Sequence, residues 1–90
     1  MTKKEIVKKG SEIKPTVHIG KEGLTESVIE EVRTQIKNRG IVKVRVLPAA
    51  GMDKDRVGME LAIETGSRLI ETRGFTILLS DERLFQKKGN

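Results

Sequence analysis

One short stretch, residues 14–25 (KPTVHIGKEGLT), limits most strongly what this chain can fold into. Its lysine–proline pair disfavours helix, and the alternation in residues 16–19 predicts a short strand. Two glycines that flank Lys21 and Glu22 follow, and Thr25 is then a suitable N-cap for a helix. A strand that runs through a Gly-x-x-Gly turn into a helix places backbone N–H groups beside a lysine. This arrangement suits an anion.

Hydrophobic periodicity places the other elements around this stretch. A short basic helix begins after Thr2, which forms a capping box with Glu5. The helix that follows the glycine turn is expected to end at Gly40, and a third helix is expected between Asp53 and Gly66. Strands are expected at residues 16–19, 41–47, 68–72 and 75–80. The order α-β-α-β-α-β-β predicts an α/β (α+β) fold whose two long helices cover one face of a sheet.

The opposite face of this sheet is expected to be basic and open to solvent. In the second strand, valines alternate with Lys43 and Arg45, so both basic side chains project away from the core. His18 of the first strand lies on the same side. It has no partner nearby in the sequence for metal binding or catalysis, so it is either an ordinary surface residue or an RNA contact.

The last two strands are expected to form a hairpin with Arg73-Gly74 as its two-residue turn. Direct pairing across this turn predicts a set of core-facing residues, which are Ile70, Phe75, Ile77 and Leu79. Leu69 and Leu78 then remain on the open face. Two leucines in that position indicate either a small docking patch or a hairpin register that differs from this one.

The charge pattern indicates an acidic partner. With 18 Lys and Arg against 13 Asp and Glu, the formal charge is +5. The basic residues are concentrated in residues 1–21 and 37–45, on either side of an acidic segment at residues 22–36. Two phenylalanines are too few for the stacking platforms of many RNA-binding modules. Any RNA contact should therefore depend on phosphates and shape.

Several function classes are excluded or disfavoured by composition. The chain has no cysteine, so disulfides, thiol redox chemistry and thiolate metal sites are excluded, and we expect neither metal nor cofactor. One histidine and the lack of paired carboxylates in an apolar setting argue against an enzyme. Without a signal-peptide pattern or a long apolar run, we expect a soluble cytoplasmic monomer. Residues 1–85 should form one domain, followed by a polar tail at residues 86–90.

The segment KPTVHIGKEGLTESVIEEV resembles the signature of the CRM domain (chloroplast RNA splicing and ribosome maturation), whose single-domain bacterial form is the YhbY-type protein. The lysine–proline pair, the strand, the GxxG-Leu-Thr-Glu run and a later Glu64-Thr65-Gly66 occur in the family's order. The resemblance extends from about Thr2 to Ser80. It implies a four-stranded mixed sheet under two helices with an additional N-terminal helix, like the C-terminal domain of translation initiation factor three.

The resemblance also implies binding to structured RNA, particularly ribosomal RNA in large-subunit precursors, with ribosomal proteins as further partners. The GxxG loop is likened to that of KH domains. The predicted RNA-binding residues are Lys14, His18, Gly20, Lys21, Glu22, Gly23, Lys43 and Arg45. Phe75, Ser80 and Asp81 stand where the family has basic or aromatic residues, so we expect the RNA nearer the first two strands than the last two. The alternative is a protein-docking module within a ribonucleoprotein or translation complex.

Overall fold

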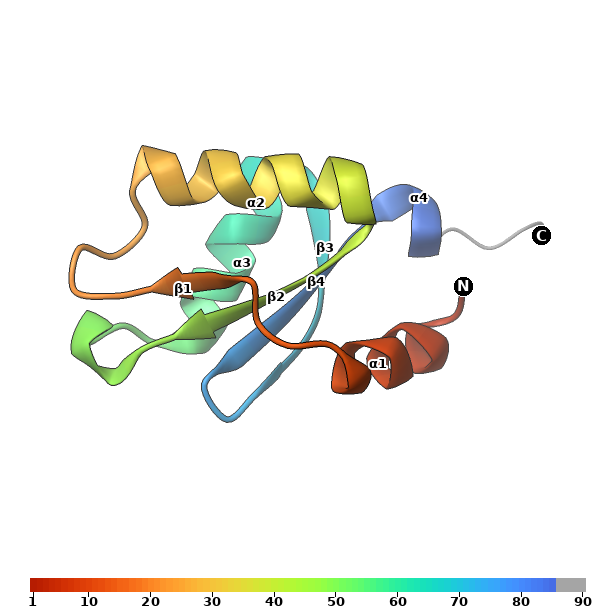
Figure 1. Cartoon of the computed structure of the whole chain (residues 1–90), viewed down its shortest axis with the longest axis horizontal. Helices are drawn as coiled ribbons and strands as arrows, with labels where there is room; N and C mark the ends of the chain where they lie inside the picture. Colours follow the sequence, from red (N-terminus) through yellow and green to blue (C-terminus); the bar gives the residue numbers. More distant parts are fainter. Residues whose placement is uncertain (86–90) are drawn as a thin grey trace.

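The computed structural model describes residues 1–85, and the expected polar tail at residues 86–90 lies outside the described residues. The helices and strands follow in chain order (Figure 1): α1 (Lys3–Glu12), β1 (Val17–Ile19), α2 (Glu26–Arg39), β2 (Ile41–Val46), the 3₁₀ turn η1 (Pro48–Ala50), α3 (Lys54–Thr65), β3 (Ser67–Arg73), β4 (Thr76–Asp81) and α4 (Glu82–Phe85). This confirms the predicted order, and α4 is an addition to it.

The four strands form one mixed sheet in the order β1-β2-β4-β3. β1 is parallel to β2, whereas β4 is antiparallel to both of its neighbours. The parallel pair is joined by α2, as a crossover connection requires. The predicted four-stranded mixed sheet is therefore confirmed.

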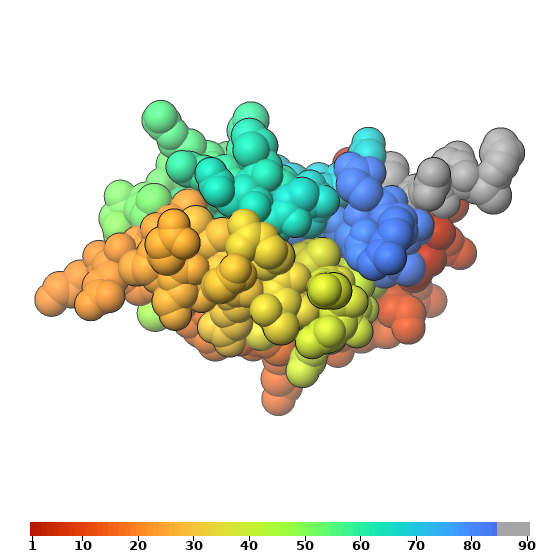
Figure 2. Space-filling model, turned by 90° about the horizontal axis from the view of Figure 1, so that it is seen from above, coloured from red at the N-terminus to blue at the C-terminus, as the bar shows by residue number. Residues whose placement is uncertain are grey.

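The two long helices cover one face of this sheet (Figures 1 and 2). Thr25 and Asp53 begin them as N-caps by accepting hydrogen bonds from the amides of Val28 and Asp55, and glycines at positive φ end them. The core between helices and sheet consists of buried side chains from both layers, which are Val17, Ile19, Val32, Ile36, Val42, Val44, Val46, Val57, Leu61, Ile77 and Leu79.

The opposite face is half covered, which corrects the expectation that it is open to solvent. Helix α1 packs there, and its Ile6 forms a second buried cluster with Ile70 and Leu78 (Figure 1). Gly10 allows this close approach, because a Cβ at that position would lie 2.5 Å from the Leu78 side chain. The sequence predicted the helix α1 but not where it packs. Its packing site includes Leu78, which was expected to lie exposed on the open face.

The predicted hairpin forms, but its turn lies one residue later than predicted, so Thr72 pairs with Ile77 and not with Phe75. Gly74 and Phe75 make the turn, and Arg73 pairs with Thr76. An additional residue in β3, between the Leu69–Leu79 and Glu71–Leu78 pairs, forms a β-bulge. If the pairing continued from Leu69–Leu79 without this bulge, Glu71 would pair with Ile77 and its carboxylate would face the core.

The bulge also changes which residues face the core. Leu69 packs against the main core, whereas Ile70 and Leu78 lie on the opposite face beneath α1. Phe75 is at the tip of the hairpin with 54% of its surface exposed. The prediction that Ile70 and Phe75 share the core of Ile77 is therefore wrong, because the bulge moves Ile70 to the other face and Phe75 lies in the turn.

Replacing Phe75 by Ala should test this register. We expect the free energy of unfolding to fall by less than about 1 kcal/mol, since the ring is mostly exposed. Leu79→Ala, at a fully buried position, should cost about 2–5 kcal/mol. Urea denaturation of both variants measures the difference, and equal losses would contradict the register described above.

Candidate functional site

The glycine loop protrudes at one end of the molecule (Figures 1 and 2). The amide of Gly23 donates to the carbonyl of Gly20 at 2.9 Å, which closes a four-residue turn. Lys21 and Glu22 occupy its tip, and both are exposed. Within the part of the chain that the structure describes, neither of their amides donates a hydrogen bond. The turn therefore presents two available N–H groups beside the Lys21 ammonium group.

The two glycines of this loop have different reasons to be glycine. Gly23 has a φ of +73°, and a Cβ there would lie 3.3 Å from Met52 Sδ. The positive φ explains why glycine occupies position 23. Gly20 has no positive φ, and the nearest atom to an added Cβ is a methyl group of Leu47 at 3.9 Å, which is an ordinary contact. Neither backbone conformation nor internal packing requires glycine at position 20.

A row of polar side chains crosses all four strands on the face that α1 leaves uncovered. His18 of β1 pairs with Arg45 of β2, Arg45 pairs with Thr76 of β4, and Thr76 pairs with Arg73 of β3. Directly paired residues project from the same face of a sheet. His18, Arg45 and Arg73 are exposed, and Thr76 is half-buried. The row therefore places two guanidinium groups and an imidazole on one surface.

Arg73 is the basic residue of this row that the sequence did not predict. The expected turn contained Arg73, so the residue had no assigned face. Moving the turn to Gly74-Phe75 pairs it with Thr76. No sequence signal separates this turn from the expected one, because the expected register, which pairs Glu71 with Thr76, also keeps this carboxylate away from the core.

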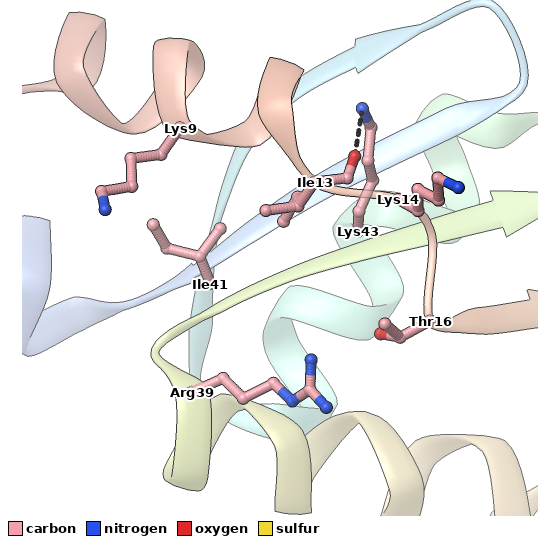
Figure 3. Close-up of a pocket in the computed structure, with 7 residues that line it drawn as sticks. All are labelled: Lys9, Ile13, Lys14, Thr16, Arg39, Ile41 and Lys43. Carbon is pink, nitrogen blue, oxygen red and sulfur yellow. Dashed lines mark hydrogen bonds between the residues drawn. The ribbon is translucent and has the colours of Figure 1, made fainter.

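Lys43 is held inside the protein more than the sequence indicated. Its Nζ donates to the carbonyl of Gly10 at 2.8 Å. It also donates to the carbonyl of Ile13 at 3.3 Å, and Figure 3 shows this bond. Both acceptors lie at the C-terminal end of α1, where a cation satisfies unpaired carbonyls and complements the helix dipole. Lys43 is half-buried and fastens α1 to the sheet. Lys14, in contrast, is exposed in the linker between α1 and β1.

The described residues show no alternative chemistry. Within residues 1–85, no group of three His, Asp or Glu side chains is arranged to hold a metal ion. No helix in that range has the length and apolar character needed to cross a membrane. The hydrogen bonds from the Arg83 guanidinium lower the pKa of the Asp81 carboxyl, so this carboxylate is already paired with a cation.

Residues 1–79 match the sequence profile of the CRS1/YhbY (CRM) domain. The chain belongs to the CRM domain family. Membership confirms the resemblance of the GxxG segment, and the family consists of RNA-binding domains that are not enzymes. The family assignment therefore agrees with the expectation from composition that the protein has no catalytic site.

Named relatives agree with this membership. The chain is 38% identical over 82 residues to a probable RNA-binding protein of Methanocaldococcus jannaschii, covering 89% of this chain and 60% of the relative. It is 31% identical to the probable RNA-binding protein YqeI of Bacillus subtilis, covering 82% of this chain and 77% of the relative. The chain therefore spans a little under two thirds of the archaeal relative.

A solved structure supports the fold. The solution structure of a hypothetical protein from Staphylococcus aureus superimposes with a TM-score of 0.72, covering 99% of this chain and 88% of that one. The two are 24% identical in sequence, so the likeness concerns the fold alone. In a third relative, the CRS2-associated factor 1 of rice chloroplasts, the match covers 11% of a much longer protein at 28% identity.

The two basic residues of β2 should respond differently to loss of charge. Lys43→Met removes the donor for two α1 carbonyls, so we expect a loss of about 1.5–3 kcal/mol in the free energy of unfolding. Arg45→Met, two residues along on the same face, should change it by less than about 0.5 kcal/mol because Arg45 is exposed. Urea denaturation and amide exchange of α1 check this, and equal stability of the two variants would contradict the anchoring role.

Proposed function

We propose that this protein binds structured RNA through the loop at Gly20–Gly23 and the row formed by His18, Arg45 and Arg73. The family membership makes RNA the favoured polyanion. The loop offers two available amides, the Lys21 ammonium group and the N-terminal end of α2, all of which stabilise a phosphate. The row extends the positive surface across the sheet. Lys14 adds a cation at the other end of β1.

The observation that carries this proposal is that Gly20 has no internal reason to be glycine. A residue whose Cβ would fit the folded chain, in a loop that protrudes into solvent, is explained by something that approaches from outside. A phosphate that contacts the backbone at Gly20 would collide with any side chain there. Glu22 opposes an anion in the same loop, so Lys21 and the turn amides must outweigh it.

The mode of recognition follows from what this surface lacks. Phe75 follows the turn glycine Gly74 and precedes Thr76 of the row, so it lies at the hairpin tip and outside the β3–β4 pairing. Contacts to phosphates and ribose therefore dominate over base stacking, and selection depends on RNA shape more than sequence. We propose ribosomal RNA in large-subunit precursors as the target, with the protein acting as a cytoplasmic assembly factor.

The protein-docking alternative uses the open face of the sheet. The sequence offered an apolar patch there at Leu69 and Leu78. In the structure, Leu69 packs against the core and Leu78 is 3% exposed beneath α1. The uncovered part of that face carries the polar row instead.

Gly20→Ala should separate binding from folding. We expect unfolding free energy within about 1 kcal/mol of the parent, since the added Cβ makes ordinary contacts. Affinity for a folded rRNA fragment should fall by about 1–2 kcal/mol, which is roughly a 5- to 30-fold increase in Kd. Filter binding and urea denaturation measure the two quantities. An unchanged Kd would remove the basis of the loop's proposed role.

Lys21→Glu should weaken RNA binding and reduce the dependence of affinity on salt. Loss of one phosphate contact lowers the slope of log K against log salt by about 0.7–0.9. Arg56→Glu is the matched control, because Arg56 is an exposed cation on α3, on the far side of the sheet. If both variants lose the same affinity, the effect is one of net charge and not of the loop.

The rRNA assignment has a separate test. Crosslinking in cells, followed by sequencing of the RNA bound to the protein, should recover large-subunit rRNA and its precursors. Recovery of unrelated transcripts by the wild-type protein would contradict the assembly role. If those crosslinks also do not depend on Lys21, RNA binding itself would remain, but not through the proposed loop.

A further inference from the structure

A basic groove lies at the opposite end of β1 from the glycine loop. It has a volume of about 530 Å³ and opens between α1, the linker to β1, the start of β2 and the end of α2. Its principal lining residues are Lys9, Ile13, Lys14, Arg39, Ile41 and Lys43. Figure 3 shows Lys9 reaching down from α1 and Arg39 extending from α2, on opposite sides of Ile41.

The groove exists because β1 is much shorter than β2. β1 begins at Val17, opposite Val44, and the amide of Thr16 makes the last bond to this side of β2 at the carbonyl of Lys43. Ile41 and Val42 therefore have no backbone partner on that edge. Helix α1, fastened by Lys43, and the last turn of α2 form the two walls.

The charge around this groove is one-sided. Four of its lining residues are cations from four separate segments, and none is acidic. Within residues 1–85, the side chains of Lys9, Lys14 and Arg39 make no hydrogen bond or ion pair. Asp81 of β4 lies beside Gly40, because its amide donates to the Gly40 carbonyl. Its carboxylate forms an ion pair with Arg83. Neighbouring cations without a counter-charge favour binding of an external anion.

The floor of the groove distinguishes it from a simple phosphate site. Ile13 and Ile41 project into the space between the cations, and Ile13 is 37% exposed although it is a large apolar residue (Figure 3). A volume of this size falls in the range of small-molecule pockets. An apolar floor with a cationic rim fits a ligand that has a flat apolar part and a phosphate.

We propose that this groove receives one unpaired nucleotide of the bound RNA. Its base lies against Ile13 and Ile41, and its flanking phosphates lie between Lys9, Lys14 and Arg39. This inference rests on the proposed RNA-binding function. Residues 14–21 run along the edge of the sheet, and at about 3.3 Å per residue the groove and the glycine loop are roughly 20 Å apart. The RNA would then contact the protein at two ends of β1.

A first experiment uses small ligands with the intact protein. Adenosine monophosphate at millimolar concentration should shift the NMR signals of the Ile13 and Ile41 methyl groups and the Lys9 and Arg39 side chains. Inorganic phosphate at the same concentration should leave the methyl signals in place. Equal methyl shifts from both ligands would mean a plain anion site, and no shift from either would remove the nucleotide site. Both outcomes overturn the proposal.

A second experiment compares one RNA hairpin with a single unpaired adenosine and the same hairpin fully paired. Lys9→Gln with Arg39→Gln should weaken binding of the first hairpin and lower its salt slope by about 1.4, at 0.7 for each lost phosphate contact. Binding of the paired hairpin should be unchanged. Lys4→Gln is the matched control, since Lys4 is an exposed lysine of α1 outside the groove.

This comparison separates the groove from the loop. Lys21→Glu should weaken both hairpins, because the loop contacts phosphates in either. If Lys21→Glu weakens both while the double variant affects neither, the loop function stands and the groove proposal fails. If Lys21→Glu has no effect on either hairpin, the proposed function fails as well.

Discussion

The contact between Ile6 of α1 and the apolar end of the β3–β4 hairpin determines how the rest of the surface is arranged. Ile6, Ile70 and Leu78 are at most 4% exposed, and burying a side chain of this kind contributes about 1.5–3 kcal/mol. Their packing holds α1 on the second face of the sheet. From there its last carbonyls meet Lys43, and Lys9 stands beside the groove.

The second face is consequently divided into two halves with different uses. The half under α1 is apolar and closed, so it completes the fold. The other half carries Arg45 and Arg73, which flank Thr76 on either side. Both arginines are exposed. Helices α2 and α3 occupy the first face (Figures 1 and 2). Exposed cations lie on this half of the second face, at the glycine loop and around the groove.

Local signals predicted the elements well. Thr2, Thr25 and Asp53 act as N-caps, and the valine alternation of β2 gives its buried face, because these features depend on residues within one turn or one strand. The bulge in β3 was not predictable in the same way, since it places Ile70 against Ile6 of α1, a residue from a distant segment. Lys43 shows the same limit, because its partners at Gly10 and Ile13 are some 30 residues away.

The central claim is that RNA contacts the loop at Gly20–Gly23 and the uncovered half of the sheet. The most direct measurement is an NMR titration of the labelled protein with a folded large-subunit rRNA fragment. We expect shifted amides at residues 18–24 and around Arg45 and Arg73, with the outer surfaces of α2 and α3 unchanged. Shifts concentrated on α3, with an unperturbed loop, would contradict it.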